Sequence, residues 1–141
     1  MISYHTDTKG VTPERLVGFF EGWPNPPSPE THLRILEGSD RVVLAVDDET
    51  KGVVGFVTAI TDGVLAAYVP LLEVLPEYRG RGIGCELALR VLDSLGEYYM
   101  VDLVCDPELE GFYEPLGLRP AHAMVVRRRE RQSGRPGDPA D

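Results

Sequence analysis

The chain has 141 residues, of which 43% are hydrophobic and 26% charged, and its formal net charge at pH 7 is -9. These values are typical of one soluble globular domain, large enough to bury a sizeable core. The acidic balance argues against nucleic-acid binding, because phosphates require a basic face. The sequence shows neither an apolar run of membrane-spanning length nor a secretory signal, so we expect no membrane partner and a cytoplasmic location.

The predicted elements alternate in a way that favours an α/β fold built on a mixed sheet. Helices are predicted where apolar residues recur at helical spacing, and strands where apolar runs lie between turn residues. In chain order we predict a strand over 1–6, helices over 12–23 and 29–39, strands over 40–48, 52–60 and 64–76, a helix over 83–95, a strand over 98–106, a short helix over 106–117 and a strand over 122–129.

Three of these elements carry further expectations. Thr12 as the N-cap and Pro13 at the first helical position favour the helix over 12–23. Pro70 cannot donate a ladder hydrogen bond, so its strand is expected to bend or bulge there. The strand over 98–106 is nearly all apolar and is therefore expected in the centre of the sheet. We expect one domain over 1–129, followed by a polar, flexible tail over 130–141.

A glycine-rich turn, "PEYRGRGIG" over 76–84, stands between a predicted strand and a predicted helix. A helix N-terminus presents unpaired N–H groups and a partial positive charge, which together suit an anion such as a diphosphate. Neither the P-loop pattern nor the dinucleotide-binding spacing of glycines is present. From these residues alone, a turn that binds nothing stays an alternative.

The stretch "VLPEYRGRGIG" resembles the acetyl-CoA pyrophosphate-binding signature of the GNAT superfamily of N-acetyltransferases, Arg/Gln-x-x-Gly-x-Gly/Ala. Arg79, Gly82 and Gly84 stand at the fixed positions of that signature. Further along, "FYEPLGL" over 112–118 is similar to the family's "FY-x-x-x-GF" ending, with Leu118 in place of the common Phe. The resemblance covers about residues 66 to 120.

This resemblance implies a GNAT-like fold, in which a mostly antiparallel mixed sheet is flanked by helices and its parallel fourth and fifth strands splay apart. Acetyl-CoA would lie in the V between these strands, with its diphosphate on the turn and its pantetheine arm beside Val74. Asp106 stands where many members of the family have an Asn that touches this arm, although its role as a plain helix N-cap, which needs no ligand, is the favoured explanation. The implied cofactor-binding residues are Val74, Arg79, Gly80, Arg81, Gly82, Ile83, Gly84 and Asp106.

The resemblance also implies the reaction, acetyl transfer to a primary amine of a small molecule, a peptide or a protein. Tyr113 matches the family's tyrosine and is the candidate proton donor to the departing thiolate, with aromatic packing as its alternative role. The base that takes the amine proton is expected to be Glu73, with Asp102 or a water relay as alternatives. A non-catalytic acyl-CoA-binding or regulatory module is the competing hypothesis.

Other residues add expectations about partners and metals. Cys85 and Cys105 are the only cysteines and are expected to be free buried thiols; two thiols alone make no metal site, so we expect no metal. His5, His32 and His122 are scattered, and surface or loop positions are expected for them. A homodimer is compatible with apolar C-terminal strands, although no residue pattern requires one.

Overall fold

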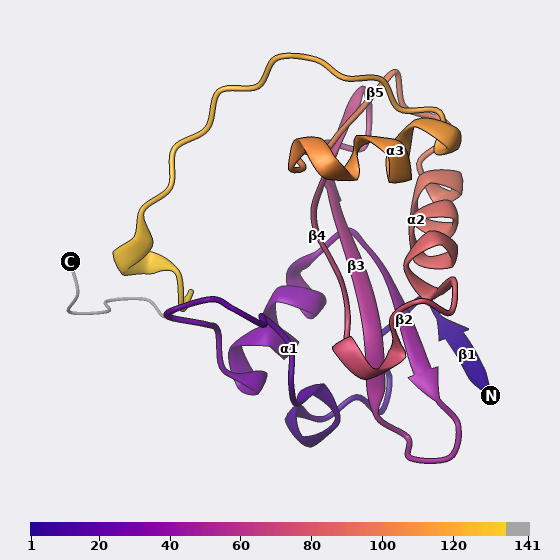
Figure 1. Ribbon diagram of the computed structural model, residues 1–141, viewed down its shortest axis with the longest axis vertical. Coiled ribbons are helices and arrows are strands. Elements are labelled where there is room, and N and C mark those ends of the chain that lie inside the picture. The colour runs from indigo at the N-terminus through magenta and orange to yellow at the C-terminus, as the bar shows by residue number, and fades with distance from the viewer. Residues whose placement is uncertain (135–141) are drawn as a thin grey trace.

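The computed structural model describes residues 1–134 and contains one five-stranded sheet (Figure 1). Neighbouring strands pair antiparallel from β1 to β4, whereas β4 and β5 pair parallel. This confirms the predicted mixed sheet. The strands follow the order β1 (Ile2–His5), β2 (Arg41–Asp47), β3 (Val53–Thr61), β4 (Ala66–Val74) and β5 (Met100–Asp102).

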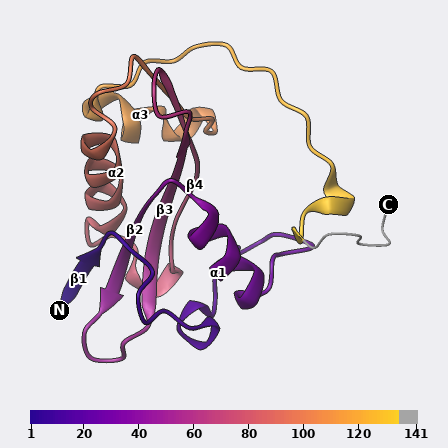
Figure 2. The same cartoon turned by 180° about the vertical axis from the view of Figure 1, so that it is seen from behind.

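Helices cover both faces of the sheet (Figures 1 and 2). The predicted helices over 29–39 and 83–95 are confirmed as α1 (Pro29–Gly38) and α2 (Ile83–Ser94). Strand β2 buries alternate residues on opposite faces, because side chains point to alternate sides of a strand. Val43 and Ala45 pack in the core cluster that contains α2, and Val42, Leu44 and Val46 pack in the cluster that contains α1.

Strand β4 bulges where Pro70 was expected to disturb it. Thr58 pairs with Leu71 and Ile60 pairs with Tyr68, so Val69 and Pro70 together stand opposite a single residue of β3. The bulge allows a residue without an N–H to lie inside a long strand. It also shifts which backbone groups of the C-terminal half of β4 face β3.

The pairing of β4 with β5 is confined to the first third of β4. Three residue pairs join the strands, the last of them Tyr68 with Asp102. Strand β4 then continues to Val74 without β5 beside it. The splay of these parallel strands, implied by the family resemblance, is confirmed.

The predicted helix over 12–23 does not form. Only a 3₁₀ turn, Pro13–Leu16, is present, and Thr12 makes no side-chain capping bond to it. The backbone then adopts positive φ at Gly18, Phe20 and Gly22, which no right-handed helix can include. The helical spacing of the apolar residues was misleading here, since Leu16 is buried at the end of the 3₁₀ turn and Phe20 is buried in the loop that follows.

The predictions for two C-terminal strands were also wrong. Strand β5 is short and stands at the edge of the sheet, not in its centre, with Met100 39% exposed. Residues 122–128 form no strand, because no strand of the described chain lies where they could pair. Of the expected tail, the described residues 130–134 include part of a 3₁₀ turn, Arg129–Arg131, and residues 135–141 lie outside the described part.

His32 is buried rather than exposed, contrary to expectation. Its side chain is 1% exposed and lies between the rings of Phe19, Phe20 and Phe56, with centroids 4.4 to 5.2 Å away. Neither ring nitrogen has a hydrogen-bond partner. Burial lowers the pKa of His32 to about 4, so the imidazole is neutral at neutral pH.

Among the described residues, no helix is long and apolar enough to cross a membrane.

Candidate functional site

The glycine turn connects β4 to α2 and takes a left-handed backbone conformation at two glycines. Gly80 has φ +78° and Gly82, the N-cap of α2, has φ +81°. A Cβ built at either position meets no atom within 4 Å. The glycines are therefore required by the backbone conformation, and the space beside them is open to a ligand.

The N-terminus of α2 opens onto this space. The first helical hydrogen bond runs from the N–H of Glu86 to the carbonyl of Gly82 at 3.0 Å, so the N–H groups of Ile83, Gly84 and Cys85 have no acceptor within the helix. Gly82 makes no side-chain cap. Exposed amides and the positive end of the helix dipole together make this end of α2 suitable for an anion.

The two arginines of the turn brace it. The Arg79 guanidinium donates from Nε to the carbonyl of Val74 at 3.0 Å and forms an ion pair with Glu21 at 3.2 Å. The Arg81 guanidinium donates to the carbonyl of Glu77 and lies 4.9 Å from the centroid of the Tyr78 ring. Both side chains stay exposed, so positive charge remains at the surface of the turn.

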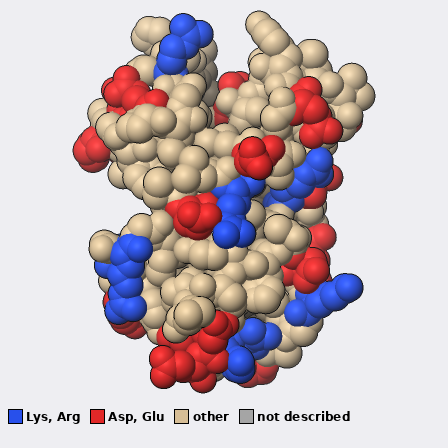
Figure 3. Space-filling model, turned by 90° about the vertical axis from the view of Figure 1, so that its right-hand side faces the viewer, with Lys and Arg blue, Asp and Glu red and all other residues tan. Residues whose placement is uncertain are grey.

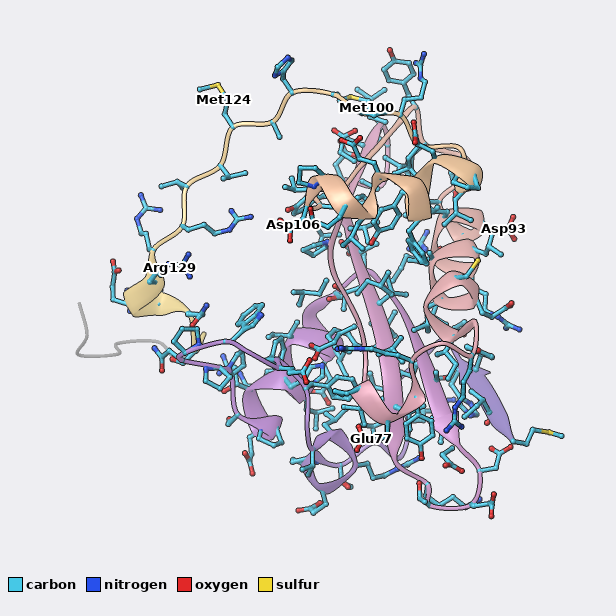
Figure 4. All side chains as sticks on the ribbon, in the orientation of Figure 1. Glu77, Asp93, Met100, Asp106, Met124 and Arg129 are labelled. Carbon is cyan, nitrogen blue, oxygen red and sulfur yellow. The ribbon has the colours of Figure 1, made fainter. Side chains whose placement is uncertain are left out.

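Around the turn, charges of both signs are mixed. Figure 3, which views the molecule from the α2 side, shows acidic and basic side chains next to one another over most of this face, with a group of acidic side chains at its lower end. Figure 4 places Glu77 at the turn before α2 and Asp106 beside α3 (Glu110–Tyr113). Besides the exposed Arg79 and Arg81, the groups here that suit an anion are therefore the backbone amides and the positive end of the helix dipole.

Val74 presents its backbone to the side that β5 leaves free. The N–H of Leu75 donates to the carbonyl of Val54 on β3 at 2.8 Å. Because backbone groups alternate in direction along a strand, the N–H and carbonyl of Val74 face away from β3. The carbonyl accepts from Arg79, and the N–H points into the splay.

Helix α3 brings Tyr113 to the same region. A Cβ built on Gly84 would lie 3.7 Å from a methyl carbon of Val74 and 3.8 Å from the ring of Phe112, so β4, α2 and α3 meet at this point. Tyr113 stacks edge-on against Phe112, with centroids 4.8 Å apart. Burial, with a smaller contribution from Cys105, raises the pKa of the Tyr113 phenol, which therefore keeps its proton at neutral pH.

Asp106 begins the 3₁₀ turn Pro107–Leu109 that leads into α3, but its side chain makes no capping bond. The expectation that the Asp106 side chain caps this turn is therefore wrong, although Asp106 does occupy the N-cap position. Its carboxylate stays exposed next to Cys105, a free thiol whose pKa is raised by desolvation, Glu110, Asp106 and Glu108.

Glu73 is held by a loop that the sequence did not suggest. Its carboxylate accepts hydrogen bonds from the N–H of Phe20 at 2.8 Å and the N–H of Glu21 at 3.2 Å. The side chain of Glu21 in turn pairs with Arg79, which connects the loop to the glycine turn. In the sequence, Gly18 and Gly22 were the residues that could have indicated a loop here, since both adopt positive φ. Asp102, the alternative base, is exposed on β5.

Two surface hollows lie outside this region. One is lined by Ser3, His5 and Asp7 among others, and the other by Trp23, Gln132 and the arginines 127 to 129. Trp23 is 38% exposed and its ring lies 4.9 Å from that of Phe20. It therefore both anchors its loop and lines a hollow, the two roles that the sequence left open.

Comparison with known proteins places this geometry in a family. The family model described as "Acetyltransferase (GNAT) family" matches residues 9–118. The chain belongs to the GNAT family of acetyltransferases. This assigns it to acetyl-CoA-dependent acetyl transfer, and among the described residues no group of His, Cys, Asp or Glu could hold a metal ion.

Solved structures of GNAT proteins are similar over nearly the whole chain. A candidate acetyltransferase from Deinococcus radiodurans R1 is 53% identical, with a TM-score of 0.92, covering 96% of this chain and 94% of that one. A GNAT-family acetyltransferase from Streptococcus pneumoniae TIGR4 is 29% identical, with a TM-score of 0.73 and coverage of 92% and 100%. An aminoglycoside N-acetyltransferase in complex with CoA shares the fold at 18% identity and a TM-score of 0.63, with coverage of 91% and 94%. No curated protein matches.

Proposed function

We propose that this protein transfers the acetyl group of acetyl-CoA to a primary amine of a small molecule, a peptide or a protein by direct attack. One arrangement carries the proposal. The splayed β4 presents the Val74 N–H beside an uncapped helix N-terminus, and α3 brings Phe112 there, with the ring of Tyr113 packed against it.

The residues of the splay fit acetyl-CoA. The amides from Arg79 to Gly84 would hold its diphosphate, because Gly80 and Gly82 leave the space beside them open. The Val74 N–H would pair with the amide-bearing pantetheine arm as a neighbouring strand does. Asp106, exposed ahead of α3, would contact the same arm. When bound, acetyl-CoA supplies an activated thioester carbonyl.

Two side chains would move the protons. An alkyl amine has a pKa of about 10.4, so its proton must be removed before attack. Glu73 uses one acceptor site on each carboxylate oxygen for a loop N–H and retains others, through which it would receive this proton by way of water. The protonated phenol of Tyr113 would supply a proton to the departing thiolate. The Val74 N–H would stabilise the oxygen that gains negative charge.

Ligand-induced stabilisation and thiol release test this function. Acetyl-CoA is expected to raise the melting temperature, because a ligand at a hundred times its Kd stabilises by about 2.7 kcal/mol. A dinucleotide such as NAD should leave the melting temperature unchanged. Release of CoA thiol across a panel of amines would establish transfer. Binding without release for any amine would favour the acyl-CoA-binding module, and no binding would overturn the proposal.

A further inference from the structure

The loop over residues 18–22 (loop 18–22) follows the first 3₁₀ turn and has an unusual backbone. Gly18, Phe20 and Gly22 all have positive φ, at +101°, +64° and +81°. Within the described chain, Phe20 and Lys51 are the only non-glycine residues with positive φ. Such a conformation persists only where the surrounding structure imposes it, and it often marks a functional segment. The contacts that impose it therefore indicate what this loop does.

Ring packing fixes the position of loop 18–22. Phe20 is 4% exposed, and the centroid of its ring lies 4.9 Å from those of His32 and Trp23. Its backbone N–H donates to the Glu73 carboxylate, as does the N–H of Glu21. The loop therefore sets where the proposed base stands, because hydrogen bonds from backbone N–H groups to a carboxylate are strong ones.

An ion pair attaches loop 18–22 to the glycine turn. The Glu21 carboxylate lies 3.2 Å from a terminal nitrogen of Arg79, whose Nε donates to the carbonyl of Val74 at 3.0 Å. A guanidinium has five N–H donors, so Arg79 keeps donors for an anion at the turn while it holds Glu21. One arginine thus joins the loop that holds Glu73, the end of β4 and the turn that would take a diphosphate.

We propose that Glu21 is a positioning residue, which couples occupancy of the glycine turn to the setting of the Glu73 carboxylate through Arg79. The inference rests on the proposed function, because the anion at the turn is the diphosphate of acetyl-CoA. Glu21 would touch neither the substrates nor the reacting atoms. Its side chain holds Arg79 and its backbone N–H holds Glu73, so a change at the arginine would reach the proposed base through one residue.

Binding at the turn would strengthen the ion pair. Without a ligand, the side chains of Arg79 and Glu21 are 50% and 52% exposed, and an ion pair in that much water holds its partners weakly. A diphosphate on the turn would displace water from the guanidinium and restrict its movement, which increases its attraction for Glu21. Loop 18–22 would then be ordered around Glu73 before the amine attacks. Because coupling is reciprocal, a fixed loop would also favour binding at the turn.

Amide hydrogen exchange in the presence of CoA tests the coupling. CoA carries the diphosphate but no acetyl group, so the measurement does not depend on transfer. In the wild type, saturating CoA is expected to slow exchange at the Phe20 and Glu21 amides at least about fivefold, the lower end of typical coupling between sites. Glu21→Gln, saturated with CoA as shown by calorimetry, should lose this slowing. Glu14→Gln, at an exposed acid whose side chain has no partner among the described residues, should keep it.

Trp23 gives a spectroscopic readout of the same loop. It is the only tryptophan in the chain, and its ring lies against that of Phe20. Its emission is expected to shift when CoA binds the wild type and to stay unchanged when CoA binds Glu21→Gln. A shift of equal size in the two proteins would contradict a coupling through the ion pair.

Kinetics test whether the coupling serves transfer. At saturating acetyl-CoA, Glu21→Gln is expected to lower turnover about fivefold, whereas its unfolding midpoint should stay unchanged because the ion pair is half-exposed. In an Arg79→Gln background, Glu21→Gln should have no further effect on turnover, because the pair is already absent. Full turnover in Glu21→Gln, or an equal loss in both backgrounds, would overturn the positioning role.

The outcomes separate this inference from the proposed function. If CoA does not bind the wild type, the diphosphate site is wrong and the inference is wrong with it. If CoA binds but exchange of the loop amides does not change, only the coupling is wrong. If CoA slows that exchange but no amine releases thiol from acetyl-CoA, the coupling is confirmed and transfer is not.

Discussion

The N–H of Phe20 donates to the Glu73 carboxylate at 2.8 Å, across 53 positions of sequence. Phe20 has φ +64°, an unfavourable conformation for a non-glycine residue, and it is buried at 4% exposure. The carboxylate thus fixes a strained loop at the end of β4 that enters the glycine turn. Glu73 is therefore a structural anchor of the site in addition to its proposed role as a base.

Glu73→Gln tests both roles. The glutamine offers one acceptor oxygen and one NH₂ group to two N–H donors, so one donor loses its partner. We expect the free energy of unfolding to fall by about 0.5–1.5 kcal/mol, the net contribution of a typical hydrogen bond, because the Phe20 bond is part-buried and the Glu21 bond is exposed. We also expect turnover to fall by about a hundredfold, as for loss of a general base. Denaturant titration and steady-state kinetics measure the two effects.

Turnover measured on fully folded protein separates the roles of Glu73. If Glu73 accepts the amine proton, Glu73→Gln should lose turnover even at a temperature at which the variant stays fully folded. Glu77→Gln is the matched control, since Glu77 is an exposed acid of the same turn and its side chain makes no hydrogen bond to a described residue. A variant with reduced stability but wild-type turnover when folded would leave Glu73 as an anchor alone.

Tyr113→Phe removes the phenol and keeps the ring against Phe112. We expect turnover to fall by about 10²-fold, because the departing thiolate loses its proton donor. The affinity for acetyl-CoA, measured by calorimetry, should stay nearly unchanged. Tyr99→Phe, at a residue 83% exposed, should retain full activity. Equal turnover in the wild type and Tyr113→Phe would remove Tyr113 from the mechanism.

Gly82→Ala places a side chain at φ +81°. The left-handed conformation costs a non-glycine residue about 1–2 kcal/mol, so the melting temperature should fall and the N-terminus of α2 should be distorted. Acetyl-CoA should bind at least about tenfold more weakly, equivalent to about 1.4 kcal/mol. Gly38→Ala is the control, since it has no positive φ and meets no atom within 4 Å. Unweakened binding by Gly82→Ala would move the diphosphate site elsewhere.

His32 should make the protein less stable in mild acid. Its pKa falls from 6.5 to about 4 on folding, so between these values the unfolded chain binds a proton that the folded chain does not. The stability is fully present above pH 6.5 and is lost as the pH falls toward 4, by about 2 kcal/mol at about pH 5.

Replacement of His32 tests this dependence. His32→Leu should reduce the loss of unfolding free energy between about pH 8 and about pH 5 by about 2 kcal/mol, because no proton uptake remains at this position. His122→Gln, at an exposed histidine, should keep the wild-type dependence. Urea titrations at both pH values provide the measurement. The same pH dependence in His32→Leu and the wild type would contradict the assignment.

Local signals predicted the sheet and the glycine turn well. Pro70 indicated a bulge because a missing N–H has the same consequence in any strand, and Gly82 indicated a special backbone at the start of α2. The two family motifs then predicted a splay that no local pattern contains. The bulge and the glycine turn depend on residues close in sequence, whereas the splay was implied by the family resemblance.

Features set by distant partners could not be predicted. The loop after Leu16 is fixed by the Glu73 carboxylate, and its apolar spacing was indistinguishable from that of a helix. His32 is buried by rings from two other segments. The strand predicted over 122–129 was wrong, because a strand requires a neighbour and the described chain supplies none.

The three residue pairs between β4 and β5 also determine how the molecule opens. Few ladder bonds join the unit from β5 to α3 to the rest of the sheet, whereas β3 and β4 are paired along nearly their full length. The amides of β5 should therefore exchange with solvent through local opening well before those of β3. A ligand that bridges the two strands would suppress this opening, so its binding free energy would include the cost of ordering this unit.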